Sequence, residues 1–140
     1  DHVKVMFFMM DLDYFKKIND SLGHHAGDEL LVFVAQTLHN ALRSSDLACR
    51  MGGDEFAAAL VFKDSCSTDF MVSRANQIFD KITMTLASGE HPISISMGVS
   101  IEEEDIRTFN QLYEAADKAL YASKNRGRRC LSVYNKEKMG

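Results

Sequence analysis

The chain has 140 residues, of which 46% are hydrophobic and 26% charged, so it can fold as one domain around a buried core. Its net charge of −4 argues against a nucleic-acid backbone or an anionic membrane as the main partner. Three cysteines without a C-x-x-C spacing predict neither a disulfide framework nor a zinc site. We therefore expect a single cytoplasmic domain over residues 1–140, without a signal peptide and without membrane contact by this segment, although a parent protein could be membrane-anchored.

The first half of the chain predicts a strand, a helix and a hairpin. Residues 3–10 form a near-continuous apolar run, which is typical of a strand buried on both faces. Apolar residues recur every three or four positions over 29–42, which indicates an amphipathic helix. Two short apolar runs, 47–51 and 56–62, are separated by a Gly-Gly-Asp-Glu segment, which favours a tight hairpin with two acids at its tip.

The second half of the chain alternates helices and strands. A helix is expected over 69–87, a strand with one buried face over 93–101, a third helix over 108–123 and a last strand over 130–134. Helices mixed with strands and a hairpin indicate an α+β fold, an α/β sandwich in which a mixed central sheet is flanked by helices.

Two acidic residues follow the first predicted strand. Asp11 and Asp13 are two positions apart, which places both side chains on one side of the strand end. An ionised carboxylate at the end of a buried strand is costly unless it meets a cation or hydrogen-bond donors. The alternative is structural, because Asp13 precedes residues 14–17 and would cap a helix that begins there.

The predicted hairpin adds Asp54 and Glu55 to this set. The glycines beside them let the backbone approach a ligand or another strand closely. Three or four carboxylates in one pocket would repel one another, and their pKa values would rise, unless a divalent cation neutralised them. Mg²⁺ prefers oxygen ligands and commonly combines one or two carboxylates with phosphates, so a magnesium site is the hypothesis that these acids favour.

Basic side chains stand at two places where they could meet phosphates. Lys16 lies one turn beyond the first acids, and residues 124–128 end the last predicted helix in a basic cluster. The alternative for this cluster is the ordinary one, a solvated helix end that complements the helix dipole.

Asn19, His24 and Asp28 lie in the polar stretch 16–28, which we interpret as a loop that turns the chain. The alternative is a base-binding segment. An amide and a carboxylate are the groups that contact a guanine edge, because they pair with its donors and acceptors.

Four segments of the chain form an ordered set of motifs. They read D-L-D-Y-F-K-K-I-N-D at 11–20, G-H-H-A-G-D at 23–28, R-M-G-G-D-E-F at 50–56 and A-D-K-A-L-Y-A-S-K at 116–124. Together they resemble the GGDEF domain of bacterial diguanylate cyclases, over residues from about 5 to 134. The resemblance implies a fold similar to the palm of nucleotidyl cyclases and polymerases, and the condensation of two GTP to cyclic di-GMP and two pyrophosphates.

The resemblance also implies a metal site and catalytic residues. Asp11, the Leu12 carbonyl, Asp54 and Glu55 would hold Mg²⁺ or Mn²⁺. Asp54 would in addition help to deprotonate the attacking 3′-hydroxyl, and Lys16 would stabilise the charge that develops on the phosphates.

For the substrate, the resemblance implies two groups of contacts. Asn19 and Asp28 would bind the guanine base, with His24 nearby, whereas Lys124 and Arg128 would hold the β- and γ-phosphates. Each subunit would bind one GTP, so the resemblance implies a homodimer in which two sites face each other.

An R-x-x-D segment, Arg43 to Asp46, stands five residues before Gly52, the spacing at which the family places a product-binding inhibitory site. The alternative is a surface ion pair between a helix end and a strand start, worth about 0–1 kcal/mol.

The family pattern normally begins with a helix carrying a D-x-L-T-G-L-x-N-R-like segment, and we expect residues 1–140 to lack it. The parent protein is expected to carry sensor or other signalling domains. The alternative function is a catalytically silent module that binds GTP or cyclic di-GMP; relatives of that kind typically lose the Gly-Gly-acid-Glu-Phe signature, which this chain keeps.

Overall fold

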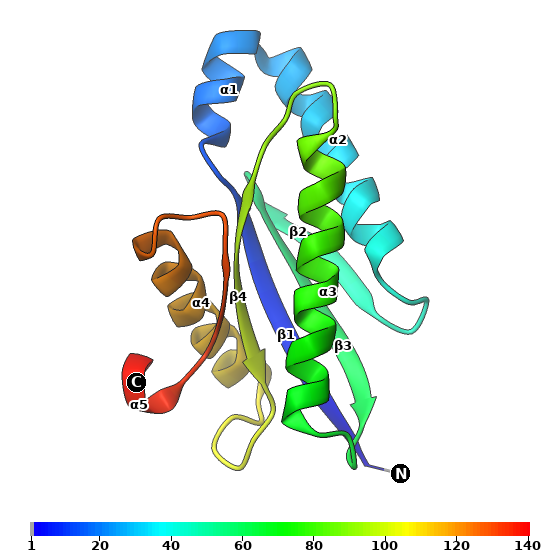
Figure 1. The fold of residues 1–140 in the computed structure, drawn as a ribbon, viewed down its shortest axis with the longest axis vertical. Coiled ribbons are helices and arrows are strands. Elements are labelled where there is room, and N and C mark those ends of the chain that lie inside the picture. Colours follow the sequence, from blue (N-terminus) through cyan, green and yellow to red (C-terminus); the bar gives the residue numbers. More distant parts are fainter. Residues whose placement is uncertain (1) are drawn as a thin grey trace.

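Five strands form one mixed sheet in the computed structural model of the chain, which describes residues 2–140 (Figure 1). The strands are β1 (Val3–Leu12), β2 (Leu47–Gly52), β3 (Glu55–Lys63), β4 (Ile95–Ile101) and β5 (Leu131–Val133). Their spatial order is β2-β3-β1-β4-β5, and the pairs are antiparallel except for β4 and β5, which are parallel. The predicted mixed sheet is confirmed. Strand β2 forms one edge of this sheet, and its six residues are all exposed.

The helices lie on both faces of the sheet (Figure 1). They are α1 (Phe15–Leu22), α2 (His24–Ala41), α3 (Thr68–Ala87), α4 (Phe109–Asn125) and α5 (Lys136–Met139). Within residues 2–140, no helix is both long enough and apolar enough to cross a lipid bilayer.

Strand β1 lies in the middle of the sheet, and this position explains why its residues form a continuous apolar run. Phe8 and Met10 point to the face covered by α2 and α3, whereas Phe7 and Met9 point to the face covered by α4. Because successive side chains alternate between faces, a strand covered on both sides needs apolar residues at every position.

Strand β4 is buried at all seven positions, so the prediction of one exposed face was wrong. Helix α4 packs directly on that face, and the small residues there make this close approach feasible. A Cβ atom at Gly98 would lie 2.2 Å from the Leu120 backbone nitrogen and 2.3 Å from the Ala116 carbonyl oxygen. The Ser100 hydroxyl donates a hydrogen bond to the Leu112 carbonyl at 2.7 Å. A small polar residue can therefore lie beneath a helix instead of facing water.

The polar stretch 16–28 is helical, so its interpretation as a loop was wrong. Helix α1 occupies the first part, and α2 begins at His24 instead of Glu29. Gly23 separates the two helices with φ +91°, a conformation that favours glycine. Helix α1 has a short apolar stripe, Phe15, Ile18 and Leu22, of which Phe15 and Ile18 pack against the core without being fully buried. Three apolar residues among polar ones give only a weak helical signal.

Candidate active site

The acidic residues that were predicted to share a site meet at the carboxyl end of β1. Asp11 lies opposite Glu55 in the pairing of β1 with β3, and the Leu12 amide donates to the Asp54 carbonyl oxygen at 3.3 Å. The hairpin turns between β2 and β3, where Gly52 and Gly53 have φ values of +142° and +50°. These left-handed conformations favour glycine, and they bring the two acids of the hairpin to the end of β1.

Asp11 forms an ion pair with Lys124, which extends from the last turn of α4. The pair engages only Oδ2 of Asp11; within the described chain the other oxygen, Oδ1, is buried and has no hydrogen-bond partner. An unpartnered buried carboxylate oxygen is costly, so the site lacks one positive or donor group at this point.

The two hairpin acids are destabilised in their charged form. Burial raises the pKa of the Asp54 carboxyl above its ordinary value, and the nearby charge of Asp11 raises it further. Burial also raises the pKa of Glu55, with further contributions from Asp11 and Asp117. Lys124 lowers both pKa values, but the net direction is upward. This is the electrostatic signature of a carboxylate cluster that a cation would stabilise.

The arrangement suits a divalent ion that brings some of its ligands with it. Within residues 2–140, no three His, Cys, Asp or Glu side chains gather closely enough to hold a metal alone. Mg²⁺ needs fewer protein side chains as ligands, because it commonly retains waters and combines one or two carboxylates with substrate phosphates. The free Oδ1 of Asp11 together with one hairpin acid, Asp54 or Glu55, fits such an ion. The Leu12 side chain has no ligating atom, so only its main-chain carbonyl could contribute.

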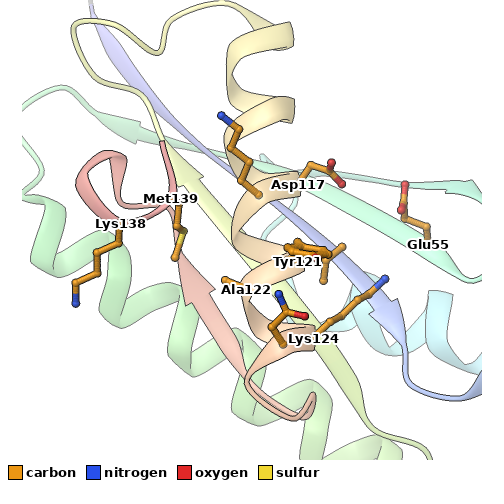
Figure 2. Close-up of a pocket in the computed structure, with 10 residues that line it drawn as sticks. Glu55, Asp117, Tyr121, Ala122, Lys124, Lys138 and Met139 are labelled. Carbon is orange, nitrogen blue, oxygen red and sulfur yellow. The ribbon is translucent and has the colours of Figure 1, made fainter.

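A pocket of about 510 Å³ lies beside this cluster and is bordered by Glu55, Asp117 and Lys124 (Figure 2). Figure 2 shows Asp117 and Lys124 extending from α4 on the side that faces Glu55, whereas Lys138 lies on the other side of that helix. Asp117 is a residue that our sequence analysis did not single out individually, although it belongs to the 116–124 motif.

Asp13, the second acid of the 11–13 pair, does not cap α1. The N-cap is Tyr14, which has φ 58° and makes no side-chain capping bond. The Asp13 carboxylate instead faces the chain after α4: it accepts a hydrogen bond from the Arg129 amide at 3.2 Å and lies 3.6 Å from Arg128 Nη1. The structural alternative of helix capping was therefore wrong, and Asp13 contacts a residue that was predicted to bind phosphate.

The residues predicted to bind guanine lie around the junction of α1 and α2. Asn19 Nδ2 and His24 Nδ1 are 3.1 Å apart. Asp28 is exposed on the first turns of α2 and borders a separate shallow pocket, and Lys16 is exposed on α1. These four residues do not border the pocket beside Glu55.

Arg43 and Asp46 form a two-point ion pair at the start of β2. Arg43 Nε and Nη2 lie 3.2 and 3.0 Å from the two carboxylate oxygens, and the hydrogen bond to Asp46 raises the pKa of Arg43. Nη2 also donates to the Val61 carbonyl oxygen at 3.1 Å. Val61 is six residues along β3 from Glu55, or about 20 Å at the usual rise per residue. The pair is therefore remote from the acidic cluster.

Residues 1–130 match the protein family described as "Diguanylate cyclase, GGDEF domain". Among curated proteins, diguanylate cyclase A of Treponema denticola is 36% identical over 120 residues, which are 86% of this chain and 32% of that protein. The chain thus spans about a third of that relative's length.

Solved structures are similar as well. The GGDEF domain of YfiN from Pseudomonas aeruginosa superposes with a TM-score of 0.83 and 32% identity, over 94% of this chain and 83% of that one. The GGDEF domain of DgcB from Caulobacter crescentus, solved in complex with c-di-GMP, has a TM-score of 0.80 and 25% identity, over 94% of this chain and 78% of that one.

Proposed function

The chain belongs to the GGDEF family of diguanylate cyclase domains, and from this we propose that it condenses two GTP into cyclic di-GMP and two pyrophosphates. One observation of the structure carries the proposal: a carboxylate cluster with an unpartnered buried oxygen lies against Lys124 at the end of β1. Acids that could bind a divalent ion thus lie beside a lysine that could bind phosphate. Phosphoryl transfer requires both kinds of group at one site.

In the proposed reaction, Asp54 accepts the proton of the 3′-hydroxyl on one GTP. That oxygen forms a bond to the α-phosphorus of a second GTP, and the bond from this phosphorus to pyrophosphate breaks. Lys124 and Arg128 would bind the β- and γ-phosphates, and Lys16 would stabilise the developing charge.

The divalent ion, Mg²⁺ or Mn²⁺, would be held by Asp11, the Leu12 carbonyl, Asp54 and Glu55. When bound, it acidifies the 3′-hydroxyl and neutralises charge at the α-phosphate. The free Oδ1 of Asp11 supports this assignment.

Asn19 and Asp28 would bind the guanine base, with His24 nearby. The 3.1 Å contact between Asn19 and His24 supports this, because it fixes the Asn19 amide on the surface between α1 and α2. One GTP per domain requires a homodimer in which two sites face each other. The related domain of the Treponema denticola relative lies in a longer protein. This supports the proposal that the parent protein of this chain carries further signalling domains.

The proposed function is tested by incubating a dimeric form of the protein with Mg²⁺ and either GTP or ATP. We expect cyclic di-GMP from GTP, and a preference over ATP of more than tenfold, because adenine would leave polar groups unpaired at a cost of about 1–3 kcal/mol each. Equal use of ATP would refute the guanine site. Binding of GTP without turnover would refute the enzyme and favour a silent binding module.

We further propose that Arg43 and Asp46 bind the product and inhibit the enzyme. An arginine side chain suits a phosphodiester or the Hoogsteen edge of guanine, and Asp46 would act by orienting it. The side chain of Asp46 is fully buried and holds the guanidinium by two contacts, so it presents Arg43 in one orientation. Product bound here could link two domains and hold their active sites apart.

Arg43→Ala is expected to relieve inhibition by micromolar cyclic di-GMP without lowering the initial rate, since Arg43 lies far from the acidic cluster. The measurement is the rate of product formation at increasing added cyclic di-GMP. Arg107→Ala, which removes an exposed arginine elsewhere, is the matched control and should leave inhibition intact. If the wild type is not inhibited, or Arg43→Ala is inhibited equally, the site is only an ion pair.

A further inference from the structure

We infer that Asp13 is a positioning residue for triphosphate binding: it fixes the turn that follows α4 and thereby holds Arg128 ready for the phosphates. This inference rests on the proposed function and concerns a residue to which that function gives no role.

Asp13 is held too tightly to act as a ligand of substrate or metal. Its side chain is only 1% exposed. The Ser94 hydroxyl donates to Oδ2 at 2.7 Å, and the Ser96 hydroxyl donates to Oδ1 at 2.6 Å. The Arg129 amide adds a third hydrogen bond, to Oδ2. Both oxygens therefore have partners inside the protein, in contrast to Asp11.

The turn that Asp13 contacts has an unfavourable backbone conformation. Gly127, Arg128 and Arg129 have φ values of +106°, +65° and +55° in succession. Left-handed conformations are uncommon for residues with a side chain, and they persist only where the surroundings enforce them. The hydrogen bond from the Arg129 amide to Asp13 and that from the Arg128 amide to the Ser123 carbonyl, at 3.0 Å, supply this constraint.

The Arg128 guanidinium is held from two sides. The Asp13 carboxylate lies 3.6 Å from Nη1, and the ring of Tyr14 lies beneath the guanidinium with its centroid 5.1 Å from Cζ. Tyr14 itself has φ 58°, which brings its ring to the surface beside the turn. A free arginine loses much side-chain entropy when it binds, so an arginine that is held in place beforehand binds a phosphate more tightly.

The test measures nucleotide binding without turnover, by calorimetry with Ca²⁺ in place of Mg²⁺. The probes are GTP and GMP, which share the base but differ in the β- and γ-phosphates. We expect Asp13→Asn to weaken GTP binding roughly tenfold, the size of one interaction with a charged group, and to change GMP binding less than about twofold. Asp105→Asn, which breaks an exposed ion pair with Lys136, is the matched control.

Two further variants separate positioning from folding. In an Arg128→Ala background, Asp13→Asn should have less than about a twofold effect, because it acts through that arginine. Tyr14→Leu, which alters an exposed ring, should weaken GTP binding about threefold with an unchanged unfolding midpoint.

The inference would be overturned if Asp13→Asn weakened the binding of GTP and GMP equally. It would also be overturned if Asp13→Asn weakened GTP binding as much in the Arg128→Ala background as in the wild type. Either result would leave Asp13 a structural residue. If Asp13→Asn does not fold, unchanged GTP binding by Tyr14→Leu overturns it. A wild type that binds both nucleotides as expected but makes no cyclic di-GMP would refute the proposed function alone.

Discussion

Asp54→Asn is expected to lower the rate of cyclic di-GMP synthesis by at least about a hundredfold, the usual contribution of a general base. The amide cannot accept the proton of the 3′-hydroxyl, and it replaces a charged ligand of the proposed divalent ion with a neutral one. The rate of product formation from GTP with Mg²⁺ is the measurement. Asp80→Asn, an exposed carboxylate on α3, is the matched control and should keep the wild-type rate.

The same variant should be folded, and its unfolding midpoint should not fall. The raised pKa of Asp54 means that its ionised form is less favourable in the folded protein than in the unfolded chain at neutral pH. Removing the charge therefore removes the cost of burying it and the repulsion from Asp11. Near-wild-type synthesis by folded Asp54→Asn would contradict its assigned role, whereas an unfolded variant would contradict its position at the hairpin.

Gly98→Ala is expected to lower the free energy of unfolding by about 3 kcal/mol or more, at the upper end of the effects of overpacking. The added Cβ would lie 2.2 and 2.3 Å from backbone atoms of Leu120 and Ala116, which cannot move without shifting the whole of α4. Urea unfolding measures the loss. An unchanged midpoint would mean that α4 can move away from β4 at no cost.

The sheet could be predicted because its signals are local. The apolar run of β1 and the paired glycines of the hairpin each determine a structure within about ten residues. The buried second face of β4 could not be predicted, because Ser96, Gly98 and Ser100 alternate with apolar residues as they would on a surface strand. Only the packing of α4 shows that they are covered.

The same limit applies to the site. The acids at 11, 54 and 55 could be proposed from their positions at a strand end and a hairpin, and Lys124 from the basic cluster that ends the last predicted helix. The partners of Asp13 could not be found, because Ser94 and Ser96 are 81 and 83 residues away in the sequence and meet it only through the pairing of β1 with β4. Two serines in a strand carry no signal of their own.

The exposed edge strand β2 makes the two halves of the site unequal in local stability. Lys124 belongs to a long helix that is packed on the fully buried β4, and Asp11 belongs to the central strand. Asp54 follows strand β2, which is paired on one side only and has no buried residue, whereas Glu55 begins β3 and is paired with Asp11. Segments with few buried contacts open locally at a small fraction of the global unfolding free energy. Strand β2 can therefore open locally and loosen the turn that leads to Asp54, while Glu55 stays paired with Asp11 and the rest of the domain stays folded.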